Sequence, residues 1–452
     1  MRLHLTKTEP IPNSQFPIPN SQFPIPNSQF PIPNSLAMPI SNSISKSTYA
    51  LVTLAYWAFM LTDGALRMIV LLHFHQLGYS PIQLAFLFLL YECAGIATNL
   101  IGGWIGSRYG LRRTLFIGLT LQIIALSALT LVDSTWTPYL TVGFVMAIQA
   151  LAGVAKDLTK MSSKSAVKLV ITEDSNSEGK LFKWVAALTG SKNALKGFGF
   201  FLGSLLLTYL GFDHALYSLA AMLVLVLTSS LIWIKGDFGK SKKKTKFTQL
   251  FSKSSAINRL SFARAFLFAS RDVWFVVGLP IFLHDIMGWS FWEVGSFMAI
   301  WVIGYGIVQA FAPKITRSKK PQHQDSTLAH SVRSAQIWIF ALCCICVAIA
   351  LAVTFEYHIS LTLLGGLCVF GFIFAINSSL HSFLILAYTD TDDVSLNVGF
   401  YYMANACGRL LGTLLSGTVY LLAGLPACLW TAAALTLIAA ISSLSLPRAL
   451  YT

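Results

Sequence analysis

Charged residues are scarce in this sequence. They make up 11% of its 452 residues, whereas 55% are hydrophobic, and the mean hydropathy is +0.66. A soluble domain carries nearer ~25% charged residues. Length alone would suggest roughly three soluble domains. The chain has too few charged residues, however, to form the water-exposed surfaces of such domains. Lipid must therefore cover much of this chain.

Motifs that carry catalytic chemistry are also missing. We find no nucleotide-binding loop, no metal-ligand spacing and no nucleophile constellation, so an enzyme is the least favoured class and no cofactor is predicted. The seven cysteines fall in apolar stretches, with three of them in the run CCIC at 343–346. We interpret them as small hydrophobic residues.

The first 47 residues differ from the rest. They repeat a seven-residue unit with two prolines, which excludes a continuous helix, and we predict an extended, disordered tail with no assigned function. Perfect repetition is also typical of a repeated DNA element, so Met1 and Met38 are alternative starts of translation. PIPNSQF occurs at 10–16, 17–23 and 24–30, followed by PIPNS at 31–35.

From Thr48 onward, apolar runs of about 20 residues alternate with short polar breaks. About 20 helical residues cross a ~30 Å hydrocarbon core. We therefore predict an all-α membrane protein with twelve transmembrane helices in two six-helix bundles, 48–234 and 261–452, joined by a basic loop, 235–260. The predicted spans are 49–72, 82–106, 113–132, 138–161, 181–208, 212–234, 261–284, 291–313, 335–355, 359–387, 398–422 and 426–446.

Lysine and arginine are absent from every second loop between these spans, whereas the central loop alone holds eight. Basic loops stay in the cytoplasm. We therefore predict that both termini and the central loop are cytoplasmic, in a bacterial plasma membrane. We attribute the net charge of +14 to this topology and predict no nucleic-acid partner. The central lysines are interpreted as a solvated loop near anionic headgroups, with a specific lipid or protein site as the alternative. The loops without Lys or Arg lie near His75, Asp133, Phe212, Asp285, His358 and Leu425.

An internal repeat supports two related halves. LGYSPIQLAF at 77–86 aligns with MGWSFWEVGSF at 287–297, and NALKGFGFFLG at 193–203 aligns with NACGRLLGTLLSG at 405–417. The offsets, 210 and 212 residues, are nearly equal. Parallel six-helix repeats are the architecture of the major facilitator fold, which binds substrate near the midplane between its halves.

The loop after the second span carries GGWIGSRYGLRR at 102–113. It resembles the signature loop of the major facilitator superfamily, with Ser107 where that family has an acidic residue. Glycine permits close helix approach and arginine holds the turn in the cytosol. The resemblance assigns a gating role to Gly103, Arg108, Gly110 and Arg112.

A longer resemblance covers almost the whole chain after the tail. It rests on LTDGALRM (61–68), HFHQLGYSP (73–81), KDLTKMSSKSAVKL (156–169), TGSKNALKGFGFFLG (189–203), RDVWFVVGLP (271–280) and GWSFWEVG (288–295). These strings resemble the organoarsenical efflux permeases. The resemblance implies export of 1-arseno-3-phosphoglycerate, arsenate resistance, and a functional partnership with glyceraldehyde-3-phosphate dehydrogenase. We further predict that export is coupled to protons and that the protein is a monomer. A sugar-phosphate importer or antiporter is the alternative.

Ionisable residues inside the spans predict an anion site. A charge at a helix centre costs on the order of 2.5–3.5 kcal/mol, so it persists where it faces a cavity or a partner. Five cations and two carboxylates give the predicted cavity a net charge of +3, which favours an organic anion. The cations are Arg67, Lys192, Lys196, Arg271 and Arg409, and we add the aligned Asn193 and Asn405 to the substrate-binding set.

The carboxylates Asp63 and Asp272 are predicted proton carriers. The alternative is that Asp63 pairs with Arg67, and Asp272 with Arg271, as structural ion pairs. That alternative leaves the lysines and Arg409 without an acidic partner. Glu92 is either a third proton site or a hydrogen-bond partner of a neighbouring helix.

Two further polar groups allow two interpretations each. The fourth span ends in lysines at every fourth residue, which we interpret as an interfacial stripe, with substrate capture as the alternative. In the tenth span, Asn377 and His381 are predicted to be satisfied packing residues, with a cavity role as the alternative. The residues of the lysine stripe are Lys156, Asp157, Lys160, Lys164 and Lys168.

Overall fold

The computed structural model describes residues 46–109, 111–133, 135–171, 177–234, 254–316, 324–388 and 394–448. Every regular element in these ranges is an α-helix. The helices are α1 (Lys46–Gln76), α2 (Pro81–Leu87), α3 (Leu89–Tyr109), α4 (Leu111–Leu129), α5 (Pro138–Ile171), α6 (Ser177–Trp233), α7 (Ser255–Phe275), α8 (Gly278–Asp285), α9 (Phe291–Ile315), α10 (Gln324–Thr354), α11 (Ile359–Ala387) and α12 (Val394–Leu444).

Ten segments of the described chain are long and apolar enough to cross a membrane. Two of them, within α6 and α12, have 43 and 45 residues, about twice the length that one crossing needs. Each contains a break, at Gly211 (φ 74°) and at Gly424 (φ 69°). Positive φ is accessible to glycine because it lacks a Cβ atom. The described residues therefore make twelve crossings, and both breaks lie where the sequence predicted loops.

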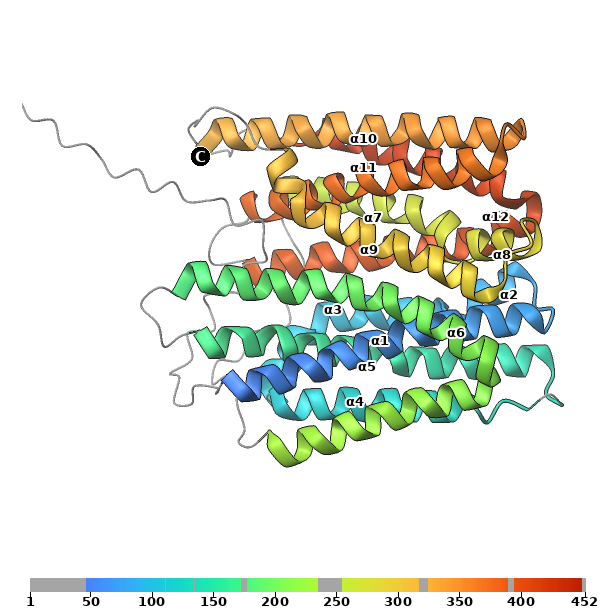
Figure 1. The fold of residues 1–452 in the computed structure, drawn as a ribbon. Coiled ribbons are helices and arrows are strands. Elements are labelled where there is room, and N and C mark those ends of the chain that lie inside the picture. Colours follow the sequence, from blue (N-terminus) through green and yellow to red (C-terminus); the bar gives the residue numbers. More distant parts are fainter. Residues whose placement is uncertain are drawn as a thin grey trace, which may run out of the picture.

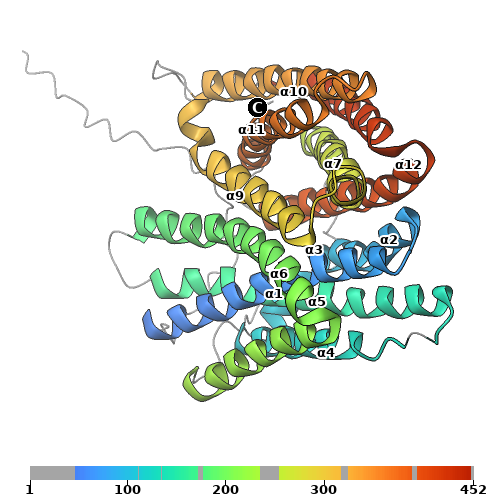
Figure 2. The same cartoon turned by 45° about the vertical axis from the view of Figure 1, so that its right-hand side comes forward.

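The helices form two bundles, α1–α6 and α7–α12 (Figure 1). The bundles meet where α6 packs on α9 and where α2 and α3 pack on α12. Figure 2 shows the two groups from another direction, with α9 and α6 facing each other between them. This is the two-bundle architecture that the internal repeat predicts.

Two predicted spans are interrupted in ways that the sequence did not indicate. The span 82–106 is divided into α2 and α3 at Phe88, and the span 261–284 into α7 and α8. At the second break the backbone N–H groups of Val277 and Gly278 donate to Ser416 Oγ of α12, each at 3.1 Å. These bonds satisfy donors that an unbroken helix would have paired internally. Helix α7 also begins at Ser255, inside the predicted central loop.

The aligned segments at 77–86 and 287–297 adopt the same turn. Gly78 has φ 84° and Gly288 has φ 71°. Two residues later Ser80 and Ser290 form capping boxes at the starts of α2 and α9. We call the end of the molecule that holds these turns the turn end, and the opposite end, where α1 begins, the terminal end; in Figure 1 they lie right and left.

The first and fifth crossings of each bundle approach closely. In α6, a Cβ atom on Gly199 would collide with the backbone carbonyl of Leu61 in α1. In α12, a Cβ atom on Gly408 would collide with that of Ala265 in α7. Glycine at these positions brings the polar residues on the paired helices together.

Candidate functional site

A buried ion-pair network joins the two bundles. Glu92 Oε1 of α3 accepts hydrogen bonds from Arg67 Nη2 of α1 at 3.0 Å and from Arg409 Nη2 of α12 at 2.5 Å. Arg409 Nε lies 3.6 Å from Asp272 Oδ2 of α7, and Asp272 Oδ1 accepts from Arg271 Nε at 2.6 Å. We call these five residues the central network. It brings together residues that the sequence assigned to substrate binding and to proton coupling.

The network corrects two predictions about pairing. Arg409 was expected to lack an acidic partner, but Glu92 and Asp272 both lie beside it. The alternative pair Asp63–Arg67 does not form, because Asp63 Oδ1 instead accepts from the Tyr91 hydroxyl at 2.6 Å. Spacing along one helix could not show that a neighbouring helix supplies the carboxylate. The predicted pair Arg271–Asp272 is present.

Of the four carboxylates in the described site, Asp63 is the one that has no cation within ion-pair distance. It is 3% exposed, and its Oδ2 atom is buried without a hydrogen-bond partner in the described part of the chain. Buried polar atoms without a partner are rare in folded proteins, so this oxygen distinguishes Asp63 from the other carboxylates of the site.

Lys192 and Lys196 lie one turn apart on α6 and are half-buried. Among the described residues, no carboxylate lies within ion-pair distance of either ammonium group. Lys196 Nζ lies 5.8 Å from the centre of the Phe200 ring. The charges of both lysines interact with those of Lys156 and Arg409, so each lysine adds repulsion to the site. A bound anion would relieve this repulsion.

The lysine stripe of the fourth span does not face lipid at its first turns. Lys156 Nζ lies 4.0 Å from the centre of the Tyr91 ring. Lys160 Nζ donates to Asn99 Oδ1 at 3.1 Å and to Asp157 Oδ1 at 3.2 Å. The interfacial interpretation is wrong for these residues, because the buried Asp157 turns this face of α5 toward α3.

The two asparagines of the predicted set lie in different places. Asn193 Nδ2 donates to Gln309 Oε1 of α9 at 3.3 Å, so it sits where the bundles meet. Asn405 Oδ1 accepts from Arg264 Nε of α7 at 3.1 Å. Sequence reasoning missed Arg264, although it stands two helical turns before Arg271 and so on the same face.

Asn377 and His381 of α11 are fully buried. Their side-chain nitrogen and oxygen atoms have no hydrogen-bond partner among the described residues. The prediction that they are satisfied packing residues is therefore wrong. Unpaired buried polar groups are rare in folded proteins.

Several predictions concern residues or side chains outside the described part of the chain. Of the gating loop, the structure describes the side chain of Arg112 alone, whose guanidinium lies 5.2 Å from the centre of the Phe116 ring. Outside it lie the tail to residue 45, the loop at 235–253, Gly110, the surroundings of Gly103, and the side chains of Arg108, Lys164 and Lys168.

The charge of the site is more positive than the sequence predicted. Eight cations and four carboxylates of the described chain lie in or beside the central network, a net of +4, compared with the predicted +3. The cations are Arg67, Lys156, Lys160, Lys192, Lys196, Arg264, Arg271 and Arg409, and the carboxylates are Asp63, Glu92, Asp157 and Asp272.

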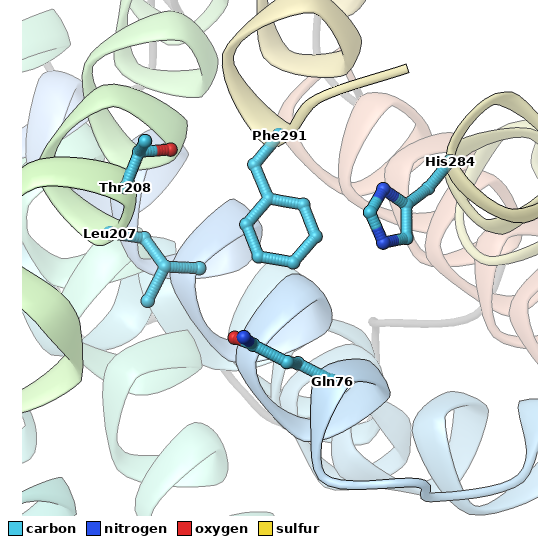
Figure 3. A pocket seen from close by; sticks show the side chains of 5 residues that line it. All are labelled: Gln76, Leu207, Thr208, His284 and Phe291. Atoms are coloured by element: carbon cyan, nitrogen blue, oxygen red, sulfur yellow. The ribbon is translucent and has the colours of Figure 1, made fainter. Parts of the chain in front are cut away.

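A separate cavity of about 330 Å³ lies at the turn end (Figure 3). Its walls hold no charged network. Close to it, His75 Nε2 of α1 contacts Asp285 Oδ1 of α8 at 2.8 Å, which joins the two bundles through residues at aligned positions of the repeat. The residues that line the cavity are Gln76, Leu207, Thr208, His284 and Phe291.

Residues 52–380 match the model of the Major Facilitator Superfamily. The chain belongs to this superfamily. It is accordingly a multi-pass membrane transporter rather than an enzyme, and the lipid bilayer and a small-molecule substrate are its partners. Comparison with curated proteins finds no match.

A solved structure of a bacterial homologue of the iron transporter ferroportin, in an inward-facing state, is similar in fold. The TM-score is 0.64, the identity is 14%, and the match covers 89% of this chain and 99% of that one. At this identity the similarity concerns the fold alone. It agrees with the predicted major facilitator fold.

Proposed function

We propose that this transporter exports an organic arsenate or phosphate anion, 1-arseno-3-phosphoglycerate, from the cytoplasm and so confers arsenate resistance. The excess of positive charge where the bundles meet carries this proposal. A phosphate monoester carries roughly −1.5 to −2 charges at neutral pH. Arginine offers it a planar fork of donors, and lysine offers a mobile point charge.

The choice of this particular anion rests on the sequence resemblance to organoarsenical efflux permeases. In that scheme glyceraldehyde-3-phosphate dehydrogenase makes the arsenate ester, and the permease removes it. We propose that the terminal end faces the cytoplasm of a bacterial cell, and the basic loops of the sequence support this orientation. Substrate would then approach Lys192 and Lys196 from that end.

Proton exchange is the proposed driving force, with Asp63 as the proposed carrier. Asp272 and Glu92 both form ion pairs with arginines. Asp63 has one buried oxygen with no partner in the described residues. The free oxygen supports the choice of Asp63 over the two ion-paired carboxylates.

Two other substrate classes deserve comparison. A sugar phosphate that is carried inward or by exchange would use the same positive site. The direction of transport therefore distinguishes this alternative from the proposed export. The ferroportin homologue suggests a metal cation instead. A site with eight cations against four carboxylates repels a divalent cation, so its charge favours an anion.

The experiment compares intracellular arsenic after exposure to arsenate in four strains. They carry the permease alone, the dehydrogenase alone, both proteins, or neither. We expect lower arsenic only in the strain with both, and loss of the difference when a protonophore is added. Full protection by the permease alone would exclude the ester as substrate. Protection that survives the protonophore would exclude proton coupling.

A matched pair of variants connects this phenotype to the site. Lys196→Gln removes an uncompensated charge, whereas Arg259→Gln removes an exposed arginine at the start of α7. We expect the first variant to abolish protection with normal abundance in the membrane, and the second to keep it. Equal protection by both variants would contradict a substrate-binding role for Lys196.

A further inference from the structure

Arg264 of α7 is a buried cation to which the function proposed above gives no role beyond its charge. It is 4% exposed. Its Nε donates to Asn405 Oδ1 at 3.1 Å and its Nη1 to the backbone carbonyl of Ser378 at 3.0 Å. Among the described residues, no carboxylate lies within ion-pair distance of it. Burying a charge without a counter-charge is costly, and proteins rarely keep one without a reason.

Arg264 faces the same side of α7 as the central network. The Phe268 ring lies between it and Arg271, with its centre 4.1 Å from one guanidinium and 4.9 Å from the other. Seven helical residues separate the two arginines by about 10 Å along the axis. On α12, Asn405 and Arg409 lie one turn apart; Asn405 contacts Arg264, and Arg409 lies beside Asp272. The site therefore has two levels, and Arg264 with Asn405 forms the one nearer the terminal end.

Polar groups without partners surround this second level. Asn377 and His381 flank Ser378 on α11 and are fully buried, and the charge of Arg264 acts on the His381 ring. Their polar atoms have no hydrogen-bond partner in the described chain. The Ser378 hydroxyl accepts from Tyr305 of α9 at 3.3 Å. A cation without a counter-charge, beside polar side chains without hydrogen-bond partners, is typical of a ligand-binding site.

We propose that Arg264, Asn405 and the flanking Asn377 and His381 form a second anion-binding subsite. It holds the far end of a substrate whose near end lies at the central network and the α6 lysines. The inference rests on the proposed function and deepens it: the substrate has an anionic group at each end, and this subsite is the one that holds the second group. The guanidinium supplies the charge, and Asn377 and His381 supply hydrogen bonds to the bound oxygens.

The test measures binding of two probes to the purified full chain by isothermal titration calorimetry. One probe is 3-phosphoglycerate, which has a phosphate and a carboxylate, and the other is glycerol 3-phosphate, which has the phosphate alone. We expect the unaltered protein to bind 3-phosphoglycerate with a dissociation constant roughly tenfold to a hundredfold lower than that of glycerol 3-phosphate. This difference in affinity is the usual contribution of a charged hydrogen-bonded pair. Arg264→Gln should bring this ratio close to one, chiefly by weakening 3-phosphoglycerate. Arg259→Gln should leave the ratio unchanged.

Each other outcome is decisive. An unaltered protein that binds both probes equally has no second subsite, although its phosphate site stands. An Arg264→Gln variant that weakens both probes alike assigns a structural role to the arginine and overturns the inference. If the unaltered protein binds neither probe, the organic-anion function itself fails, and the subsite fails with it. Arg264→Lys keeps the charge without the fork and decides the case if the glutamine variant does not fold: a reduced ratio supports the subsite, and an unchanged ratio refutes it.

Discussion

Glu92 offers the sharpest test of the central network, through the substitution Glu92→Gln. Its carboxylate is buried and accepts from Arg67 and Arg409, which belong to different bundles. Glutamine has nearly the same shape and keeps an acceptor oxygen, but it removes the negative charge. The variant therefore isolates the charge from the packing.

The size of the effect follows from the geometry. A pair of unit charges about 4 Å apart attracts by about 4 kcal/mol at an effective dielectric constant of 20. Glu92 makes two such pairs, and the cost of burying its own charge offsets part of the gain. Removing one partner of a buried ion pair typically costs about 3–5 kcal/mol. We expect the free energy of unfolding to fall by about that amount without ligand.

An anionic ligand should reverse this loss. With Glu92 neutral, Arg67 and Arg409 are available to a phosphate group, so 3-phosphoglycerate should stabilise the variant more than the unaltered protein. The measurement is unfolding by SDS in mixed micelles, followed by the fluorescence of the eleven tryptophans, with and without the ligand. Glu356→Gln is the control, because Glu356 is exposed in the turn after α10. A variant as stable as the control, or one that the ligand does not stabilise further, would refute our account of the network.

Three further predictions concern other parts of the chain. Gly199→Ala should destabilise the protein by about 1–3 kcal/mol, because the new Cβ atom meets a backbone carbonyl of α1. Gly143 faces open space, so the control Gly143→Ala should be neutral or slightly stabilising. Unfolding in denaturant distinguishes the two variants, and equal stability would contradict the close packing of α1 and α6. His75→Ala should change stability by less than about 1 kcal/mol, because Asp285 is 43% exposed, but should alter the rate of transport in vesicles; a large loss of folded protein would contradict this. A chain that begins at Met38 should insert and give the same arsenate phenotype, and loss of membrane abundance on immunoblots would show that the repeats are needed.

Hydropathy predicted the crossings well. The breaks at Gly211 and Gly424 lie between predicted spans, because a polar or glycine-containing interval between apolar runs is a local signal. The break between α7 and α8 had no such signal. Its backbone donors are satisfied by Ser416, 139 residues along the chain from Val277, and single-helix periodicity holds no information about that contact.

The site shows the same limit. The sequence correctly selected most of the buried ions, because a charge in an apolar span is conspicuous. The sequence could not show which of these ions form pairs. Asp63 and Arg67 are one turn apart on α1, yet the partner of Arg67 is Glu92 on the next crossing. Arg264 was missed although its spacing from Arg271 placed it on the same face. Its contacts with Asn405 and Ser378 come from α12 and α11, and only the fold brings them together.

The contacts between the bundles differ in strength along the molecule, and this difference bears on how a transporter of this fold moves. At the turn end the pair His75–Asp285 is partly exposed, and such pairs contribute about 0–1 kcal/mol. At the centre Arg409 and Glu92 are buried and charged, so separating them costs several times more. Of these two charged contacts, the one at the turn end is therefore the less costly to separate. Rocking of two bundles about a central site requires a contact that separates easily at one end of the molecule. The pair His75–Asp285 is such a contact, and the repeat places it on equivalent residues of the two halves, 210 positions apart.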